Sequence, residues 1–101
     1  MKIGIPKEVH AGEKRVATTP EVAKQLIKLG YEVAIEAGAG SAAHFSDASY
    51  VEAGVTVVKN AKEIWSQSDI VLKVRGPELN PALNTEEVDL LKEKQILISF
   101  L

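Results

Sequence analysis

The chain has 101 residues, enough for one domain with a buried core, and its 46% hydrophobic and 26% charged residues are ordinary globular composition. The net charge of −2 and scattered lysines and arginines argue against nucleic-acid binding. The absence of cysteine excludes disulfides, thiolate nucleophiles and cysteine metal sites, and we predict no metal site. Without a signal segment or an apolar run of membrane-spanning length, the expected location is the cytoplasm.

The first part of the chain predicts a strand, a helix and a second strand. Residues 2–5 are the first strand, which ends at Pro6. A helix is expected to begin with Thr19 as its N-cap and Pro20 at its first position, and to end just before Gly30. Its apolar face is expected to consist of Val22, Ala23, Leu26 and Ile27. A strand over 31–37 then completes a right-handed crossover in a parallel sheet.

Residues 38–43 read GAGSAA and match the G-x-G-x-x-G/A pattern of dinucleotide-binding loops. Three features argue against that function. The next helix is expected to begin only after the better cap at Ser46, the acidic residue expected about 20 positions on is missing, and the pattern follows the second strand of its unit. We therefore interpret these residues as a glycine-rich turn that needs backbone freedom.

The rest of the chain continues to alternate helices and strands. We first expect a helix over 47–53, a strand over 55–58, a helix from the Asn60 cap through Trp65, and a strand over 70–74. A loop over 78–83 should follow, and then a helix capped by residues 84–87 with its apolar face over 88–91. The last predicted element is a strand over 96–101. About four alternations predict an α/β fold with a doubly wound, mostly parallel sheet, Rossmann-like or flavodoxin-like. Such sheets bind ligands at the carboxyl ends of their strands.

Lys73 interrupts the apolar strand over 70–74 near its carboxyl end. A lysine in a buried strand must reach water, meet a carboxylate or lose its proton. From spacing alone, we favour a side chain that snorkels to the surface from a sheet edge. The alternative is a cation in the ligand crevice.

Arg15 lies in the loop after the first strand and is the second candidate for that crevice. A guanidinium and an ammonium together would suit a small carboxylate or a keto acid, and a desolvated lysine could act in proton transfer. The alternative for Arg15 is a solvated loop charge beside Glu13.

The sequence stops at the end of an apolar strand, whereas termini usually lie at the surface. We therefore expect residues 1–101 to be a single, truncated domain of a longer protein. An exposed last strand would be a solubility hazard for the isolated piece.

Four separate motifs carry a family resemblance, and they occur in the right order along nearly the whole chain. They are KIGIPKE at 2–8, EKRVATTP at 13–20, EAGAG at 36–40 and DIVLKVRGP at 69–77. With them, the chain resembles the N-terminal domain shared by alanine dehydrogenase and the alpha subunit of proton-translocating NAD(P) transhydrogenase.

The resemblance implies that the nicotinamide-binding Rossmann domain lies downstream of residue 101, so that no cofactor-binding residue falls within this chain. In alanine dehydrogenases, the residues that match Arg15 and Lys73 hold pyruvate, and a histidine just beyond residue 101 assists proton transfer. In transhydrogenases, the domain supports an NAD(H) site, and hydride passes to NADP(H) on a partner subunit, coupled to proton movement through a membrane part. There, Arg15 and Lys73 need not be catalytic: they are either retained from the dehydrogenase ancestor or stabilise the interdomain cleft.

Three stretches resemble the transhydrogenase branch more than the other: LGYEV at 29–33, SDIVLKVR at 68–75 and LISFL at 97–101. Alanine dehydrogenases more often carry Lys-Glu-Pro at positions 75–77, where this chain has RGP. The favoured identification is a fragment of the transhydrogenase alpha subunit, a homodimer that acts with an NADP-binding beta subunit, peripheral to the inner membrane and without a span in this segment.

Two alternatives remain open. The first is an alanine dehydrogenase, which oxidatively deaminates L-alanine to pyruvate with NAD. The second is a non-catalytic domain that binds an anion in the crevice of Arg15 and Lys73.

Overall fold

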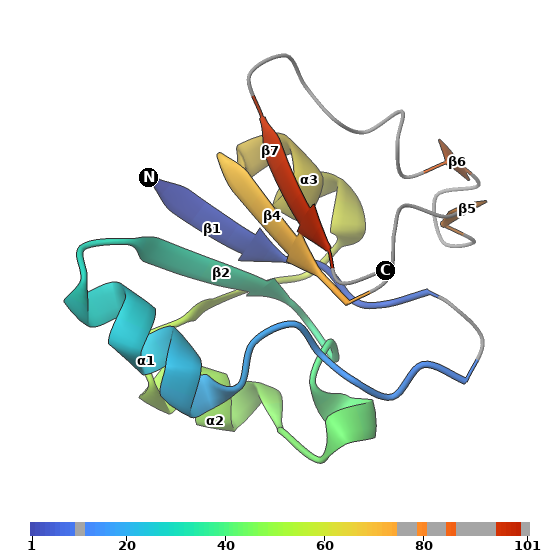
Figure 1. Ribbon diagram of the computed structural model, residues 1–101. Coiled ribbons are helices and arrows are strands. Elements are labelled where there is room, and N and C mark those ends of the chain that lie inside the picture. The colour runs from blue at the N-terminus through green and yellow to red at the C-terminus, as the bar shows by residue number, and fades with distance from the viewer. Residues whose placement is uncertain (10–11, 75–78, 81–84, 87–94, 100–101) are drawn as a thin grey trace.

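A parallel sheet with helices on both faces forms the centre of the molecule (Figure 1). The computed structural model describes residues 1–9, 12–74, 79–80, 85–86 and 95–99. The strands in these ranges are β1 (Lys2–Ile5), β2 (Glu32–Glu36), β3 (Thr56–Val58), β4 (Ile70–Lys73), β5 (Leu79–Asn80), β6 (Thr85–Glu86) and β7 (Ile96–Ser99). The helices are α1 (Pro20–Lys28), α2 (Asp47–Glu52) and α3 (Ala61–Gln67), with a single 3-10 turn, η1 (Ser41–Ala43).

The main sheet has the strand order β3-β2-β1-β4-β7, and every neighbouring pair is parallel. The chain therefore winds outward from β1 through β2 to β3 and then returns to the other side of β1 with β4. This confirms the predicted doubly wound sheet, and the order is that of the Rossmann-like alternative. The winding direction reverses between β1 and β4, and such a switch point opens a crevice at the carboxyl ends of the two strands.

The two faces of the sheet are covered by different helices. On one face, Ala23 of α1 and Tyr50 of α2 are buried against strand residues that include Ile5 and Ile35. On the other face, α3 buries Ile64 and Trp65 against a second cluster, completed by Ala34, Val58, Ala61 and Val71. The prediction that Trp65 packs on the sheet is therefore confirmed. Alternating strand residues supply both cores, as a sheet buried on its two faces requires.

Local signals fixed the helix ends as expected. The side chains of Thr19, Ser46 and Asn60 accept hydrogen bonds from backbone N–H groups in the first turns of α1, α2 and α3. Pro20 begins α1, and Gly30, with φ of 104°, follows its end. One assignment was wrong, because Val22 is 46% exposed and lies outside the buried face of α1.

The prediction for the segment after β4 was wrong where the structure describes it. Leu79–Asn80 and Thr85–Glu86 pair as the antiparallel strands β5 and β6, instead of forming a loop and the first turn of a helix. A capping box is only a local preference, which pairing between two chain segments can override. The expected apolar helix face over 88–91 and the motif at 75–77 lie outside the described residues, as do positions 100–101 of the last strand.

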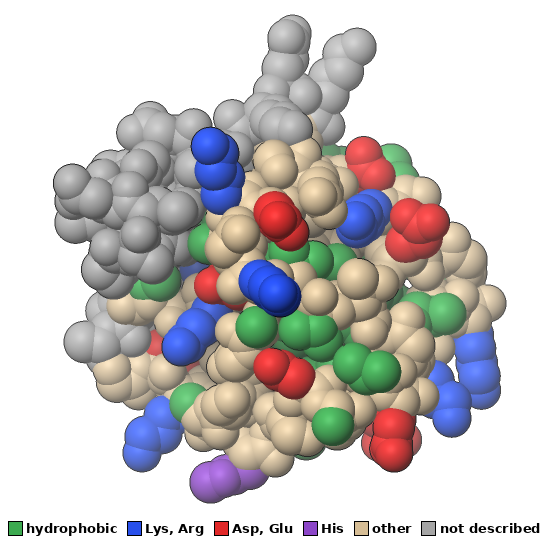
Figure 2. Space-filling model, turned by 180° about the vertical axis from the view of Figure 1, so that it is seen from behind, with side chains coloured by type: hydrophobic (Ala, Val, Ile, Leu, Met, Phe, Trp, Pro, Cys, Tyr) green, Lys and Arg blue, Asp and Glu red, His purple; other side chains and the backbone are tan. Residues whose placement is uncertain are grey.

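The described surface carries charges of both signs. On the face shown in Figure 2, acidic and basic side chains are interspersed among the described residues. No helix in the described ranges is long and apolar enough to cross a membrane.

Candidate functional site

Lys73 ends β4 at the switch point and is almost completely buried. Side chains alternate along a strand, so Lys73 shares the sheet face of Val71, two residues earlier. Its side chain is only 1% exposed. The snorkelling interpretation was therefore wrong: β4 is no edge strand, because β7 pairs along its outer side and closes that route to water.

Lys73 forms an ion pair with Glu8, which lies in the loop after β1. Glu8 Oε1 accepts a hydrogen bond from Lys73 Nζ at 3.0 Å, and Glu8 Oε2 accepts one from the backbone N–H of Val74 at 2.8 Å. The Glu8 side chain is 3% exposed, so both charges of the pair are removed from water. Of the three outcomes open to a buried lysine, the structure therefore shows the one in which it meets a carboxylate.

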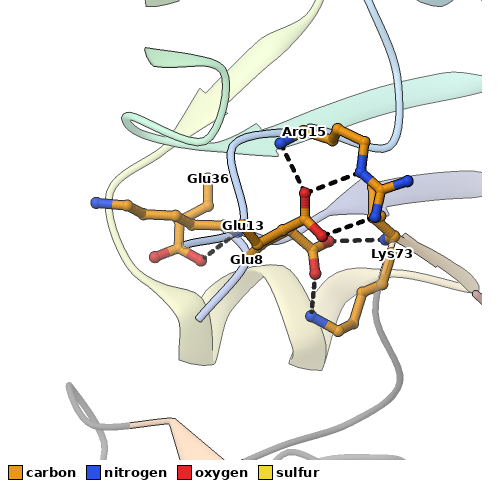
Figure 3. A network of polar contacts seen from close by, with 7 residues as sticks. Glu8, Glu13, Arg15, Glu36 and Lys73 are labelled. Atoms are coloured by element: carbon orange, nitrogen blue, oxygen red, sulfur yellow. Dashed lines mark hydrogen bonds and ion pairs between the residues drawn. The ribbon is translucent and has the colours of Figure 1, made fainter. Parts of the chain in front are cut away.

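A second carboxylate holds the same loop from the opposite side. Glu36, the last residue of β2, accepts a hydrogen bond from the backbone N–H of Lys7 at 3.0 Å. Figure 3 shows Glu36 and Glu8 on either side of this short segment. The loop after β1 is thus attached to the ends of both neighbouring strands, which fixes its path across the crevice.

Arg15 lies farther along this loop and is held by Glu13. The guanidinium donates through Nε and one terminal nitrogen to the two carboxylate oxygens, each at 2.9 Å. The Arg15 side chain is 67% exposed, so Arg15 is the solvated loop charge beside Glu13 that the second interpretation described. Its two hydrogen bonds to Glu13 nevertheless fix its orientation. The hydrogen bond to Glu13, and then the charge of Glu13, raise the pKa of Arg15 above its ordinary value, so the side chain stays cationic.

A pocket of about 200 Å³ opens beside these residues, between the loops that follow β1 and β2. Its lining residues are Lys7, Glu8, Glu13, Arg15, Gly38, Ala39, Ser41 and Ala42. Arg15 and Glu8 therefore face one cavity, and Lys73 stands directly behind Glu8. Figure 3 shows both cations beside the carboxylates of Glu8 and Glu13. Arg15 lines this pocket, whereas Lys73 is buried behind its Glu8 wall, so the convergence of the two cations on one ligand crevice stays a prediction.

This arrangement offers fixed hydrogen-bond donors and charges of both signs. A guanidinium oriented by its own carboxylate can bind a small carboxylate through two parallel hydrogen bonds. An ammonium held at the end of a parallel strand, at the switch point, occupies the usual ligand position of a doubly wound sheet. Among the described residues, no cluster of three or more His, Asp or Glu side chains could hold a metal ion.

The glycines of residues 38–43 are explained by the fold of the loop. Gly38 has φ of 79°, which strongly favours glycine. A methyl group added to Gly40 would lie 2.7 Å from a ring carbon of Tyr50 and 2.8 Å from the carbonyl oxygen of Phe45. The turn leads into η1, and the next α-helix begins only after the Ser46 cap, as predicted. The space beside Gly40 is thus filled by the domain itself.

Sequence reasoning missed Glu8 and Glu36 as site residues and treated Glu13 only as a neighbour of Arg15. The signal for Glu8 was present, because a lysine in a buried strand needs a carboxylate. Choosing among the acidic residues required the strand order, which brings the loop after β1 beside the end of β4.

Comparison with known proteins identifies the family. A profile of the alanine dehydrogenase/PNT N-terminal domain matches residues 4–101. The chain belongs to this family. The resemblance inferred from the four sequence motifs is therefore confirmed.

Relatives in this family carry two names. The NAD(P) transhydrogenase subunit alpha of Cereibacter sphaeroides is 50% identical over 99% of the chain, and the alanine dehydrogenase of Halomonas elongata is 38% identical over all 101 residues of the chain. The chain spans 18% of the first protein and 26% of the second, so it matches only a part of each. Both names denote oxidoreductases, and the chain is thus part of an oxidoreductase family.

Solved structures agree with this assignment. An L-alanine dehydrogenase superimposes on 98% of the chain with a TM-score of 0.85 and 41% identity, and the chain covers 26% of that protein. The transhydrogenase from Sinorhizobium meliloti superimposes on the whole chain with a TM-score of 0.84 and 31% identity, with 28% of that protein covered.

Proposed function

We propose that the chain is the N-terminal domain of the NAD(H)-side subunit of a proton-translocating NAD(P) transhydrogenase. The supporting observation is the 50% identity to a transhydrogenase subunit alpha over 99% of the chain, against 38% for the alanine dehydrogenase of Halomonas elongata. In this proposal, hydride moves between NAD(H) and NADP(H), and the movement is coupled to proton translocation in a membrane part.

The proposal extends to the parts of the protein outside this chain. The NAD(H) site lies in a Rossmann domain downstream of residue 101, and NADP(H) binds a partner beta subunit that acts with a homodimer of the alpha subunit. Within this chain, the attached loop after β1 gives the domain a rigid wall at the carboxyl ends of β1 and β4. That wall would face the cleft between the domains, because ligands of doubly wound sheets approach from these strand ends.

A second candidate function is alanine dehydrogenase, and two observations favour it. The L-alanine dehydrogenase structure shares 41% sequence identity with the chain, and the Sinorhizobium meliloti transhydrogenase structure shares 31%. In addition, Arg15 lines the pocket beside the switch point, and Lys73 is buried directly behind the Glu8 wall of that pocket. In this candidate, Arg15 binds the carboxylate of pyruvate, and the Lys73 ammonium polarises its carbonyl or takes part in proton transfer.

One preparation of the full-length protein, assayed with and without its partner subunit, separates the two candidates. Transhydrogenase predicts reduction of an NAD analogue by NADPH that requires the partner subunit and does not require alanine. Alanine dehydrogenase predicts reduction of NAD by L-alanine without any partner. In the second case, Lys73→Ala is expected to abolish turnover with pyruvate, and an active, folded variant would remove Lys73 from the proposed mechanism.

A further inference from the structure

Glu8 has a position that neither candidate activity explains by itself. It lies in the loop after β1, yet both of its carboxylate oxygens bind the end of β4. These are the two strands between which the winding direction reverses. We propose that Glu8 is a positioning residue, which holds the Lys73 ammonium in place and fixes the wall of the crevice. This role of Glu8 goes beyond the proposed function, because it applies whether the protein is a transhydrogenase or an alanine dehydrogenase.

The geometry gives the Glu8 carboxylate one orientation. Its two oxygens bind consecutive residues, the Lys73 side chain at 3.0 Å and the Val74 backbone N–H at 2.8 Å. A rotation of the carboxyl group that kept one contact would break the other. The ammonium at the end of a flexible four-carbon side chain is thereby held to one place.

Burial makes this contact strong. The side chains of Glu8 and Lys73 are 3% and 1% exposed, so water cannot replace either partner. A buried ammonium requires a compensating charge, and hydrogen bonds to charged groups are the stronger ones in proteins. The Glu8 charge therefore contributes to the position of Lys73 in a way that an uncharged acceptor would only partly reproduce.

Glu8 also connects Lys73 to the pocket. Glu8 lines the cavity together with Arg15, whereas Lys73 lies behind Glu8 at the end of β4. A change in the Glu8 side chain would consequently alter the pocket wall and release the ammonium together. Glu8 thus stands between the Lys73 ammonium and the pocket that Arg15 lines.

The test uses the full-length protein and three variants. Glu8→Gln removes the charge at nearly constant shape, and Glu8→Asp keeps the charge on a shorter side chain. The matched control is Asp69→Asn, because Asp69 Oδ2 accepts a hydrogen bond from the Lys2 backbone N–H at 2.7 Å and so links β4 to β1 at the opposite end of the same strands. Acetylation of Lys73 by acetic anhydride is measured by mass spectrometry, relative to the exposed Lys24 of α1.

The expected result is slow acetylation of Lys73 in the unchanged protein and an increase of roughly tenfold in Glu8→Gln. Glu8→Asp should recover part of the protection, and Asp69→Asn should leave it unchanged. The second measurement is kcat/KM for whichever of the two candidate activities the full-length protein shows, at a temperature where every variant is folded. Glu8→Gln should lower it by about 10- to 100-fold, with partial rescue by Glu8→Asp.

A purely structural Glu8 gives a different pattern. Glu8→Gln would then lower the melting temperature, but acetylation of Lys73 and kcat/KM in the folded Glu8→Gln variant would equal those of Asp69→Asn. This result would overturn the proposed positioning role of Glu8. If Glu8→Gln does not fold, loss of Lys73 protection in folded Glu8→Asp supports the inference, and full protection contradicts it. If the protein shows neither candidate activity, the proposed function fails, whereas the acetylation of Lys73 still decides the role of Glu8.

Discussion

Glu8 and Lys73 form a buried ion pair of 3.0 Å although they stand 65 positions apart in the sequence. The pair joins the loop after β1 to the end of β4, so it exists only once the sheet has its native strand order. It therefore couples the integrity of the crevice to the fold of the domain.

Lys73→Met is expected to destabilise the 101-residue chain by about 3–5 kcal/mol, because Glu8 loses the cation that compensates its buried charge. The double variant Lys73→Met with Glu8→Gln should recover much of this loss, since no buried charge of the pair remains. Urea unfolding followed by the fluorescence of Trp65, the sole tryptophan, measures both. A cost below about 1 kcal/mol for the single variant would contradict a tightly coupled pair.

Tyr50 provides a prediction about pH. Its hydroxyl donates a hydrogen bond of 2.7 Å to the carbonyl oxygen of Thr18, and burial, followed by the charge of Asp47, raises the pKa of Tyr50 from 10.0 to about 12. The stability contributed by the neutral phenol is fully present below the unfolded pKa. It is lost as the pH rises toward about 12, by on the order of 2 kcal/mol.

Tyr50→Phe isolates this contribution. At neutral pH the variant should be less stable by about 1–2 kcal/mol, because the Thr18 carbonyl loses its partner. The difference between the two proteins should narrow above pH 10, since only the unchanged protein carries the titrating phenol. Urea unfolding at neutral and alkaline pH measures the difference, and a gap that is constant with pH would contradict the raised pKa.

Gly40→Ala tests whether the glycine-rich turn serves packing. The added methyl group would clash with Tyr50 and with the Phe45 carbonyl, so we expect a loss of about 1–3 kcal/mol in the free energy of unfolding. In the full-length protein, under conditions where the variant is folded, the affinity for NADH should be unchanged. A large loss of NADH affinity in a folded variant would restore the dinucleotide-binding interpretation of residues 38–43.

Arg15→Ala separates the two candidate functions. Arg15 is 67% exposed but its partner Glu13 is only 3% exposed, so the variant is expected to lower the free energy of unfolding, and activity is compared where it is folded. If the full-length protein is an alanine dehydrogenase, the variant should lose most of its kcat/KM for pyruvate, because the bidentate partner of the carboxylate is gone. If it is a transhydrogenase, NADPH-dependent reduction of the NAD analogue should persist, and its loss in a folded variant would give Arg15 an unexpected role there.

The sequence was most informative where structure depends on neighbouring residues. Thr19, Ser46 and Asn60 cap their helices as predicted, because capping is decided within a few positions. The parallel sheet also followed from the alternation of strands and helices. The surroundings of Lys73 did not, because they depend on β7 pairing beyond β4 and on β1 placing Glu8 next to it. The short pairing of β5 with β6 likewise overrode a local capping signal.

The most direct test of the account is calorimetric titration of NADH into the isolated chain of residues 1–101 and into the full-length protein. We assign the pocket beside Glu8 and Arg15 to this domain and the nucleotide site to sequence downstream of residue 101. We therefore expect binding by the full-length protein and no measurable NADH affinity in the folded chain. Clear binding by the chain alone would contradict this assignment and would place a nucleotide site within residues 1–101.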